Sequence, residues 1–296
     1  MAELPNLTPV QVAALVPQAQ NIEIVGRGGQ KLVFRGAIDG VIYALKFAKV
    51  ILPGFDDVED VSASDIALRA KREVDIMRDC SSPHVVKLGP MGLTFLTTDN
   101  GEQIVFFTEE YIEGNDLKVV LQKNGPLPAK EVAKLGRQIG EAIKSLWELG
   151  KVHRDIKPAN IMRRDLDWSY VLLDAGLAFD ADGESISVGP VGTPLFFSPE
   201  QFDFNNRRTV LDFRSDMFSL GTTMYCMATG IHPFWASGDN SQSIYTKITT
   251  HIPPDPSSIV SGIPAELGEV IMRLLGKSPH LRYRKCDQLI AALQGL

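Results

Sequence analysis

The chain has 296 residues, of which 44% are hydrophobic and 22% are charged, and its formal net charge is −6. This composition is typical of a globular protein, and the length suits one large domain or two lobes that share a site. The acidic balance argues against a nucleic-acid-binding protein, because such proteins hold the phosphate backbone with an excess of lysine and arginine. The cysteines Cys80, Cys226 and Cys286 are far apart in sequence, which argues against disulfides and a zinc site and favours a reducing compartment.

Residues 1–20 predict a short helical extension and not a targeting segment. A secretory signal needs a basic start followed by an apolar run, and a membrane span needs about 18 consecutive apolar residues. Neither pattern occurs in the chain. Thr8 can instead cap a helix, Pro9 suits its first turn and Pro17 ends it. We therefore expect a cytoplasmic chain without a membrane span.

Residues 21–113 are expected to form a small β-rich lobe with one main helix. Runs of β-branched and aromatic residues, separated by Gly or Asp-Gly turns, predict strands at 22–27, 31–38, 41–48, 85–98 and 102–112. The helical spacing of apolar residues predicts one helix at 64–79.

Residues 114–296 are expected to form a larger α-helical lobe. Apolar residues recur at helical spacing in 128–150, 264–277 and 285–294. Segment 215–230 is apolar on almost every side, which is typical of a buried helix. The predicted fold class is therefore α+β with two lobes. We expect a cleft near residues 110–115, where the lobes join, because ligands usually bind at such junctions.

Several residues of the first lobe point to phosphate binding. Gly26, Gly28 and Gly29 occupy a turn between two strands, where glycine lets backbone N–H groups approach phosphate oxygens; an ordinary hairpin turn is the alternative. Lys46 shares a strand face with apolar residues, so its ammonium needs an anionic partner unless it reaches solvent. Glu73 lies on the apolar stripe of the expected helix and can be that partner.

The strongest functional signal is VHRDIKPANI, residues 152–161. It gathers Asp155, Lys157 and Asn160 after a helix stop, which core packing does not explain. Asp155 can accept a proton from a hydroxyl nucleophile, and Lys157 can neutralise charge on a transferring group. Asn160 can offer an amide oxygen to a hard cation such as Mg²⁺. Asp174 follows an apolar strand and can give the same cation a carboxylate.

These motifs resemble, in order and spacing, those of eukaryotic-type protein kinases, and in particular the bacterial Ser/Thr kinases. The resemblance extends from Ile22 to Ala292 and rests on GRGGQKLV, YALK, HRDIKPAN, DAG, GTPLFFSPE, SDMFSLG and SPHLR. In that family, a lysine two positions after the catalytic Asp marks Ser/Thr specificity. The resemblance also pairs Arg282 with Glu200 and makes Asp216 an anchor of the catalytic loop.

The resemblance implies a bilobal kinase fold and transfer of the ATP γ-phosphate to Ser or Thr hydroxyls of protein substrates, autophosphorylation included. The catalytic residues it implies are Lys46, Glu73, Asp155, Lys157 and Asn160. It assigns Mg²⁺, with Mn²⁺ as the other candidate, to Asn160 and Asp174. Around ATP it places Gly26, Gly28, Gly29, Val33, Ala44, Lys46, Glu110, Ile112 and Met162. The Glu110 carbonyl and the Ile112 N–H would read the adenine edge, which sets Glu109 at a position that is usually apolar.

Three residues depart from the family pattern. Ala175 replaces the aromatic of Asp-Phe-Gly. The loss of a buried aromatic costs about 3–5 kcal/mol when nothing refills the space. Phe95, Phe106 and Trp168 are the candidates to refill it. Lys31 replaces the third loop glycine and adds charge near the phosphates, and Ser198 replaces an alanine. None of these changes removes a catalytic or metal-binding side chain, so we expect a working enzyme.

Arg154, just before Asp155, indicates control by phosphorylation of the activation loop, because a phosphate there would pair with it. Ser185 and Ser187 are the candidate sites, and ordinary loop serines are the alternative. Thr193 would help to form the wall that receives the acceptor residue.

Three other functions remain open. A pseudokinase that binds ATP or a partner protein is favoured by Ala175 alone. A small-molecule phosphotransferase of the aminoglycoside type would lack segments 192–200 and 215–221, which are both present. An adaptor could dock a partner through residues 7–16, although packing of that helix on its own lobe is the simpler alternative.

Overall fold

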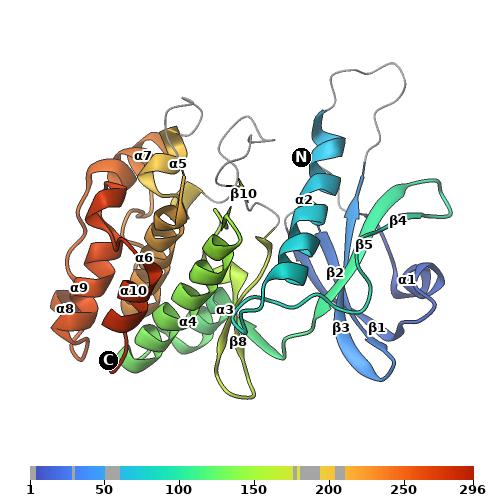
Figure 1. Ribbon diagram of the computed structural model, residues 1–296, viewed down its shortest axis with the longest axis horizontal. Helices are drawn as coiled ribbons and strands as arrows, with labels where there is room; N and C mark the ends of the chain where they lie inside the picture. Colours follow the sequence, from blue (N-terminus) through green and yellow to red (C-terminus); the bar gives the residue numbers. More distant parts are fainter. Residues whose placement is uncertain (1–4, 29–30, 51–60, 176–178, 181–193, 204–210) are drawn as a thin grey trace. The chain divides into compact units, whose positions relative to one another are not determined.

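The computed structural model describes residues 5–28, 31–50, 61–175, 179–180, 194–203 and 211–296. The chain forms two compact units (Figure 1), the first from Met1–Asp79 and Val86–Ile112 and the second from Cys80–Val85 and Glu113–Leu296. A five-stranded antiparallel sheet dominates the first unit, and the second is mainly helical. The predicted α+β class is therefore confirmed. The N-terminal segment is part of the first unit, and residues 80–85 belong with the second.

The first unit places two helices against one sheet. The elements are α1 (Pro9–Leu15), β1 (Gln20–Gly28), β2 (Lys31–Ile38), β3 (Val41–Lys49), α2 (Val61–Asp79), β4 (Thr94–Thr97) and β5 (Gln103–Glu110). The strand order is β1-β2-β3-β5-β4. This order brings β3, which carries Lys46, to the centre of the sheet between β2 and β5.

The segment at 85–98 differs from the single strand expected there, because only β4 is regular. Upstream of β4 the chain runs beside β5: the Gly89 N–H donates to the Thr108 carbonyl at 2.9 Å, and the Thr108 N–H donates to the Met91 carbonyl at 2.8 Å. Pro90, between these two residues, has no N–H to give to a ladder. A Cβ on Gly89 would lie 2.5 Å from the Thr108 hydroxyl oxygen. Gly89 and Pro90 therefore interrupt a pattern that otherwise reads as one strand.

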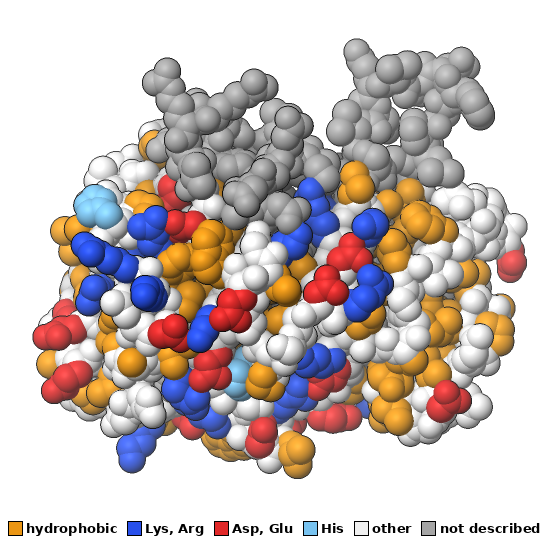
Figure 2. All heavy atoms as spheres, viewed as in Figure 1, with side chains coloured by type: hydrophobic (Ala, Val, Ile, Leu, Met, Phe, Trp, Pro, Cys, Tyr) orange, Lys and Arg blue, Asp and Glu red, His pale blue; other side chains and the backbone are white. Residues whose placement is uncertain are grey.

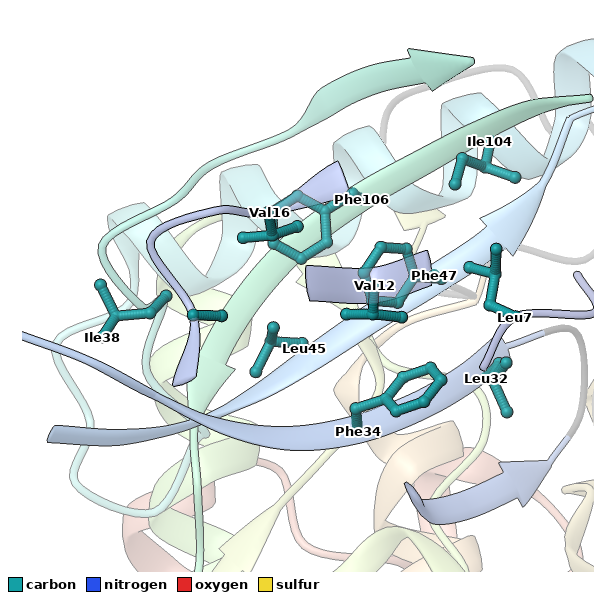
Figure 3. Packing of buried hydrophobic residues seen from close by; sticks show 11 residues of the cluster. Leu7, Val12, Val16, Leu32, Phe34, Ile38, Leu45, Phe47, Ile104 and Phe106 are labelled. Atoms are coloured by element: carbon teal, nitrogen blue, oxygen red, sulfur yellow. The ribbon is translucent and has the colours of Figure 1, made fainter. Parts of the chain in front are cut away.

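Helix α1 begins as its sequence predicts. The Gln11 N–H donates to Thr8 Oγ1 at 3.3 Å, and the Thr8 N–H donates to Gln11 Oε1 at 2.9 Å, which forms a capping box. Val12 is fully buried among residues of the sheet, including Phe34 and Phe47 (Figure 3). The helix thus packs on its own unit, and the apolar side that an adaptor would offer to a partner is already covered.

A Val12→Ala variant tests how far α1 stabilises the first unit. We expect the free energy of unfolding to fall by about 1–3 kcal/mol, because two buried methyl groups are lost and the space is incompletely refilled. Thermal unfolding followed by circular dichroism measures the change. Val10→Ala is the matched control, since Val10 is 79% exposed. Equal stability of the two variants would contradict the packing described here.

The register of the sheet separates an apolar face from a charged one. On the face that α1 covers, Phe47 stacks on Phe106 with ring centroids 4.8 Å apart. The neighbouring strand position, Lys46, pairs with Phe107 of β5. Because successive side chains of a strand point to opposite faces, Lys46 and Phe107 lie on the face away from α1. That face is the one on which Glu73 of α2 meets Lys46.

The second unit is built from helices with small strand pairs. Its helices are α3 (Leu117–Asn124), α4 (Ala129–Glu148), α5 (Pro199–Asp203), α6 (Phe213–Thr229), α7 (Ser241–Thr250), α8 (Pro256–Ile259), α9 (Ala265–Leu274) and α10 (Cys286–Ala292), with short 3₁₀ turns η1 (Pro158–Asn160), η3 (Pro194–Phe196) and η5 (Pro279–Leu281). The strands are β6 (Gly114–Asp116), β7 (Lys151–Val152), β8 (Ile161–Arg164), β9 (Tyr170–Leu172) and β10 (Phe179–Asp180). Strands β6, β8 and β9 form one sheet, and β7 pairs with β10.

Helix α6 is the centre of the second unit. Every residue from Ser215 to Thr229 is buried, as the all-round apolar sequence predicts. Helix α4 lies beside it in Figure 1, with an apolar side that includes Leu135, Ile139 and Leu146. The loop that follows α4 is therefore held by two buried helices, and this loop carries Asp155.

The surface is charged with both signs. On the face shown in Figure 2, basic and acidic side chains lie among one another, in keeping with 30 Lys and Arg against 36 Asp and Glu residues. Within the described ranges, no helix is both long and apolar enough to cross a membrane.

Candidate active site

The first unit brings Lys46 and Glu73 together, as the sequence predicts. Lys46 Nζ lies 2.9 Å from Glu73 Oε1. Glu73 is fully buried on α2, on the same stripe as the buried residues Ile66, Ala70 and Met77. A buried carboxylate needs such a partner, because its desolvation otherwise disfavours the charged form. The pair fixes α2 to the central strand of the sheet.

Two further charged groups join this pair, and sequence reasoning did not anticipate their contacts. The ammonium of Lys31, at the start of β2, binds Glu73 Oε2. Glu109 Oε2, on β5, lies 2.8 Å from Lys46 Nζ. Burial raises the pKa of Glu109 to about 6, and the positive charge of Lys46 limits the rise. The only signal in the sequence was that both residues stand where the family pattern has uncharged ones.

Val33 and Ala44, which are expected around adenine, lie on the same face of the sheet as Lys46, whereas Glu110 pairs with Tyr43 and has its side chain on the opposite face. Val33 is paired with Lys46 across β2 and β3, and Ala44, two residues before Lys46, is buried. Glu110 is the last residue of β5, and Ile112 is buried just beyond it. Gly26 is opposite Val33 in the pairing of β1 with β2, and Gly28 is opposite Lys31.

In the second unit, Asp155 gathers the two other polar residues of its loop. Lys157 Nζ lies 2.7 Å from Asp155 Oδ2. Asn160 Nδ2 donates to the backbone carbonyl of Asp155 and to its Oδ2, both at 2.9 Å. These bonds fix the amide of Asn160 through its nitrogen and turn its oxygen the other way, where it is able to serve as a metal ligand. The three side chains form one preorganised group.

The loop itself is anchored by Asp216 of α6. The backbone N–H groups of His153 and Arg154 donate to Asp216 Oδ2 and Oδ1 at 2.7 and 2.8 Å. Burial raises the pKa of Asp216, and the positive charge near it and these two N–H donors oppose the rise. Arg154 has φ of +69°, a left-handed conformation that costs energy for a residue with a side chain. The two bonds to Asp216 hold the backbone in that conformation.

Asp174 directly follows a residue whose backbone is bonded to Asn160. The Leu173 N–H donates to the Asn160 carbonyl at 2.8 Å, and the Leu173 carbonyl lies 3.0 Å from His153 Nε2, which therefore acts as the donor. Asp174 follows with φ of +59°. Met162, the residue expected below adenine, is half-buried on β8 and pairs with Val171. The second unit thus places Asp174 one residue beyond a backbone contact with Asn160.

The expected replacement for the missing aromatic at Ala175 is wrong. Ala175 is buried, but Phe95 is 58% and Trp168 is 51% exposed. Phe106 stacks on Phe47 in the cluster beside α1. None of the three candidates is therefore placed to fill the volume that the aromatic would occupy.

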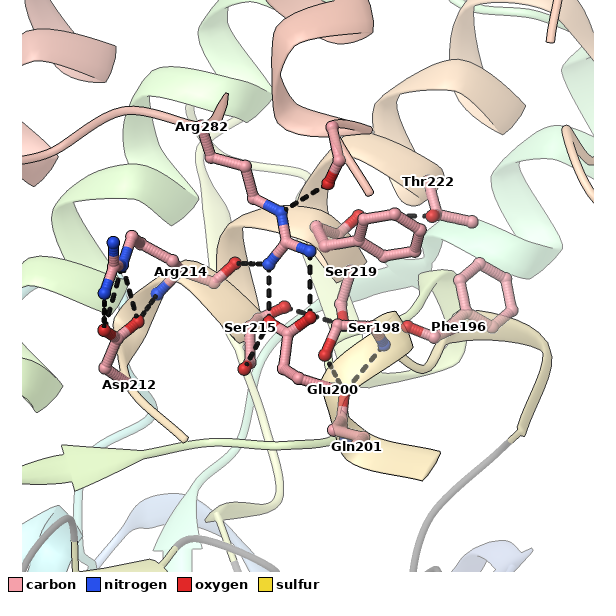
Figure 4. Close-up of polar contacts among 12 residues, drawn as sticks. Phe196, Ser198, Glu200, Gln201, Asp212, Arg214, Ser215, Ser219, Thr222 and Arg282 are labelled. Carbon is pink, nitrogen blue, oxygen red and sulfur yellow. Dashed lines mark hydrogen bonds and ion pairs between the residues drawn. The ribbon is translucent and has the colours of Figure 1, made fainter. Parts of the chain in front are cut away.

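A buried ion pair connects α5 to the turn before α10 (Figure 4). Arg282 Nη1 and Nη2 lie 2.6 and 2.9 Å from Glu200 Oε1 and Oε2, which is the pairing that the resemblance predicts. The Ser198 hydroxyl and N–H both lie within hydrogen-bond distance of Gln201 Oε1, and Gln201 Nε2 donates to the Arg154 carbonyl at 3.1 Å. Ser198 is thus a bonded member of the network that reaches the catalytic loop, a role that the sequence alone did not suggest.

Four residues of interest lie outside the residues that the structure describes. They are Gly29 of the glycine-rich loop, the candidate phosphorylation sites Ser185 and Ser187, and Thr193. The expectations for them stay predictions.

The profile of the protein kinase domain family matches residues 19–292 of the chain. The chain is 29% identical to a probable serine/threonine-protein kinase of Clostridium perfringens, over 92% of the chain and 37% of that relative. It is 32% identical to the serine/threonine-protein kinase PknE of Mycobacterium bovis, over 91% of the chain and 44% of the relative. It is 30% identical to serine/threonine-protein kinase A of Synechocystis, over 95% of the chain and 54% of the relative. The chain therefore spans between 37% and 54% of the lengths of these relatives.

Proposed function

Since the chain belongs to the protein kinase domain family, we propose that it transfers the γ-phosphate of ATP to serine or threonine hydroxyls of a protein substrate. The observation that carries this proposal is the group formed by Asp155, Lys157 and Asn160 beside Asp174. Relatives at 29% to 32% identity that are named as serine/threonine-protein kinases support the choice of acceptor. Autophosphorylation is part of the proposal, because the chain contains serines in its own loops.

The proposed roles follow from the chemistry of each side chain. Asp155 orients the acceptor hydroxyl and accepts its proton, and Lys157 neutralises charge on the transferring phosphoryl group. Lys46, held by Glu73, contacts the α- and β-phosphates. We assign the adenine edge to the Glu110 carbonyl and the Ile112 N–H. The other nucleotide contacts are assigned to Gly26, Gly28, Gly29, Val33, Ala44 and Met162.

The family implies a divalent metal ion together with ATP, and we assign Mg²⁺, or Mn²⁺ in its place, to Asn160 and Asp174. An amide oxygen and a carboxylate suit a hard cation. Mg²⁺ usually takes few protein ligands and completes its shell with waters and substrate phosphates. Within the described ranges, no group of three His, Cys, Asp or Glu residues could hold a metal. A metal held jointly by protein and nucleotide therefore fits these residues better than an all-protein site.

A cytoplasmic location is also part of the proposal. Cys80, Cys226 and Cys286 are buried thiols and form no disulfide, which is typical of proteins in a reducing compartment.

The pseudokinase is the second candidate, and Ala175 is the observation that favours it. Against it, all the side chains to which catalysis is assigned are present, and those that the structure describes lie in bonded groups. The missing aromatic would contribute packing and not chemistry.

The test of the function is transfer of labelled γ-phosphate from ATP in the presence of Mg²⁺. We expect label on the chain itself or on a generic protein acceptor, found in phosphoserine or phosphothreonine after hydrolysis. Removal of the metal with EDTA should abolish the transfer, and added Mg²⁺ should restore it, because the metal neutralises the transferring phosphates. ATP binding without any transfer to a panel of protein acceptors would favour the pseudokinase.

A further inference from the structure

Two lysines share one buried carboxylate in the first unit. Glu73 Oε1 binds the ammonium of Lys46 and Glu73 Oε2 binds that of Lys31. Both ammonium groups lie 5.8 Å from the ring centroid of Phe107, a distance that suits a cation–π contact. Lys31 therefore places a second positive charge next to the lysine to which phosphate binding is assigned.

The negative charge of Glu109 offsets the positive charge that Lys31 adds. Its carboxylate lies 2.8 Å from Lys46 Nζ and is almost completely buried. Lys31 and Glu109 each stand where the family pattern has an uncharged residue, one as an added cation and the other as an added anion. Buried charges are tolerated when they are paired. The positive charge of Lys31 and the negative charge of Glu109 therefore offset each other, and together they leave the net charge of this part of the unit unchanged.

We infer that Lys31 is a second phosphate-binding cation of the ATP site, which shares Glu73 with Lys46, and that Glu109 is a positioning residue that holds Lys46 on its other side. The inference rests on the proposed function, because it concerns the same nucleotide.

The arrangement of charges explains why the second lysine is needed. Lys46 lies between two carboxylates, at 2.9 Å from Glu73 and 2.8 Å from Glu109. With these two anions and Lys46 alone, this part of the unit would present an excess of negative charge to the phosphates of ATP. Lys31 removes that excess.

The position of Lys31 in the chain suits this role. It pairs with Gly28 across the first hairpin, so it begins the strand directly after the glycine-rich turn. Its side chain is 15% exposed, so Lys31 is not sealed from solvent as Glu73 is. An ammonium that turns from a carboxylate to a phosphate exchanges one charge-assisted hydrogen bond for another.

The experiment compares adenosine, ADP and ATP as ligands of the Lys31→Met variant. We expect the Kd of Mg-ATP and Mg-ADP to rise about tenfold or more, since one charge-assisted contact is lost, while the Kd of adenosine stays unchanged. Calorimetry or competition binding measures both. Lys31→Arg should recover most of the affinity. Lys71→Met is the matched control, because Lys71 lies on α2 with a side chain that is 64% exposed.

A second arm uses Lys46→Met. This variant should keep measurable Mg-ATP binding through Lys31, and the double variant Lys31→Met/Lys46→Met should lose it. Glu109→Gln should raise the Kd of Mg-ATP when Lys46 is present, because it removes the carboxylate that holds Lys46, and it should not raise that Kd further in the Lys46→Met background.

A Lys31→Met variant that matches Lys71→Met in every Kd, or that weakens adenosine as much as ATP, would overturn the inference and indicate a structural role for Lys31. A wild-type chain that binds no Mg-ATP would contradict the proposed function and the inference together. Normal wild-type binding with an unaffected Lys31→Met variant would contradict the inference alone.

Discussion

An Asp155→Asn variant is expected to lose phosphate transfer by a factor of about 10²–10⁴ while it keeps its affinity for Mg-ATP. Loss of a positioned general base has an effect of this size, and the proposed contacts of ATP do not include Asp155. The amide has the same shape as the carboxylate but cannot accept the proton of an acceptor hydroxyl. The ion pair between Asp155 and Lys157, which are 2.7 Å apart in the wild type, is also lost. Steady-state transfer of labelled phosphate measures the change in kcat.

The control for this variant is Asp165→Asn, which makes the same chemical change at an exposed position. It should transfer phosphate at the wild-type rate. Thermal unfolding of both variants shows whether Asp155→Asn is folded. If a folded Asp155→Asn variant transferred phosphate as fast as Asp165→Asn, Asp155 would not be the base and the mechanism proposed for this loop would be wrong.

The sequence predicts the catalytic loop well because its residues are close together in the chain. Asp155, Lys157 and Asn160 fall within six positions. Burying polar side chains of these types costs free energy, so core packing does not explain them and a chemical role does. The pairing of Lys46 with Glu73 was also predictable, since both lie on apolar faces and each needs a partner. In these cases the spacing of residues along the chain and the cost of burying an unpaired charge are enough to predict which side chains meet.

The contacts of Lys31 and Glu109 could not be predicted in the same way. They depend on the register of three strands: Lys46 pairs with Val33 on one side and with Phe107 on the other. A shift of one residue would turn every side chain of a strand to the opposite face. The same difficulty explains the error over Phe106, whose neighbour Phe107 faces Lys46 while Phe106 itself faces α1. Composition predicts that both are buried, but only the register assigns their faces.

Breaking the pair of Glu200 with Arg282 is expected to destabilise the second unit strongly. The Arg282 side chain is fully buried, and its guanidinium also donates to the backbone carbonyls of Arg214 and Gly276 at 2.7 and 2.8 Å. Burial by itself raises the pKa of Glu200, but Arg282, with help from the hydroxyl of Ser215, lowers it below its usual value. The guanidinium is therefore the main group that keeps this buried carboxylate ionised.

An Arg282→Met variant leaves that carboxylate and two carbonyls without their donor, and we expect a loss of about 3–5 kcal/mol in the free energy of unfolding. Unfolding by urea, followed by tryptophan fluorescence, measures it, because all three tryptophans belong to the second unit. Arg284→Met, at an exposed position, is the control and should cost little.

The pH dependence of the free energy of unfolding of Arg282→Met identifies why this variant is less stable. In the wild type the folded pKa of Glu200 lies below the unfolded one, so its contribution to stability is present at neutral pH and is lost as the pH falls through the folded pKa. In Arg282→Met, burial without a cation raises the folded pKa above the unfolded value, so protonation favours the folded state. The deficit relative to wild type should therefore shrink as the pH is lowered from 7.5 towards 5. A deficit that is the same at both pH values would mean that lost packing, and not the stranded charge of Glu200, is responsible.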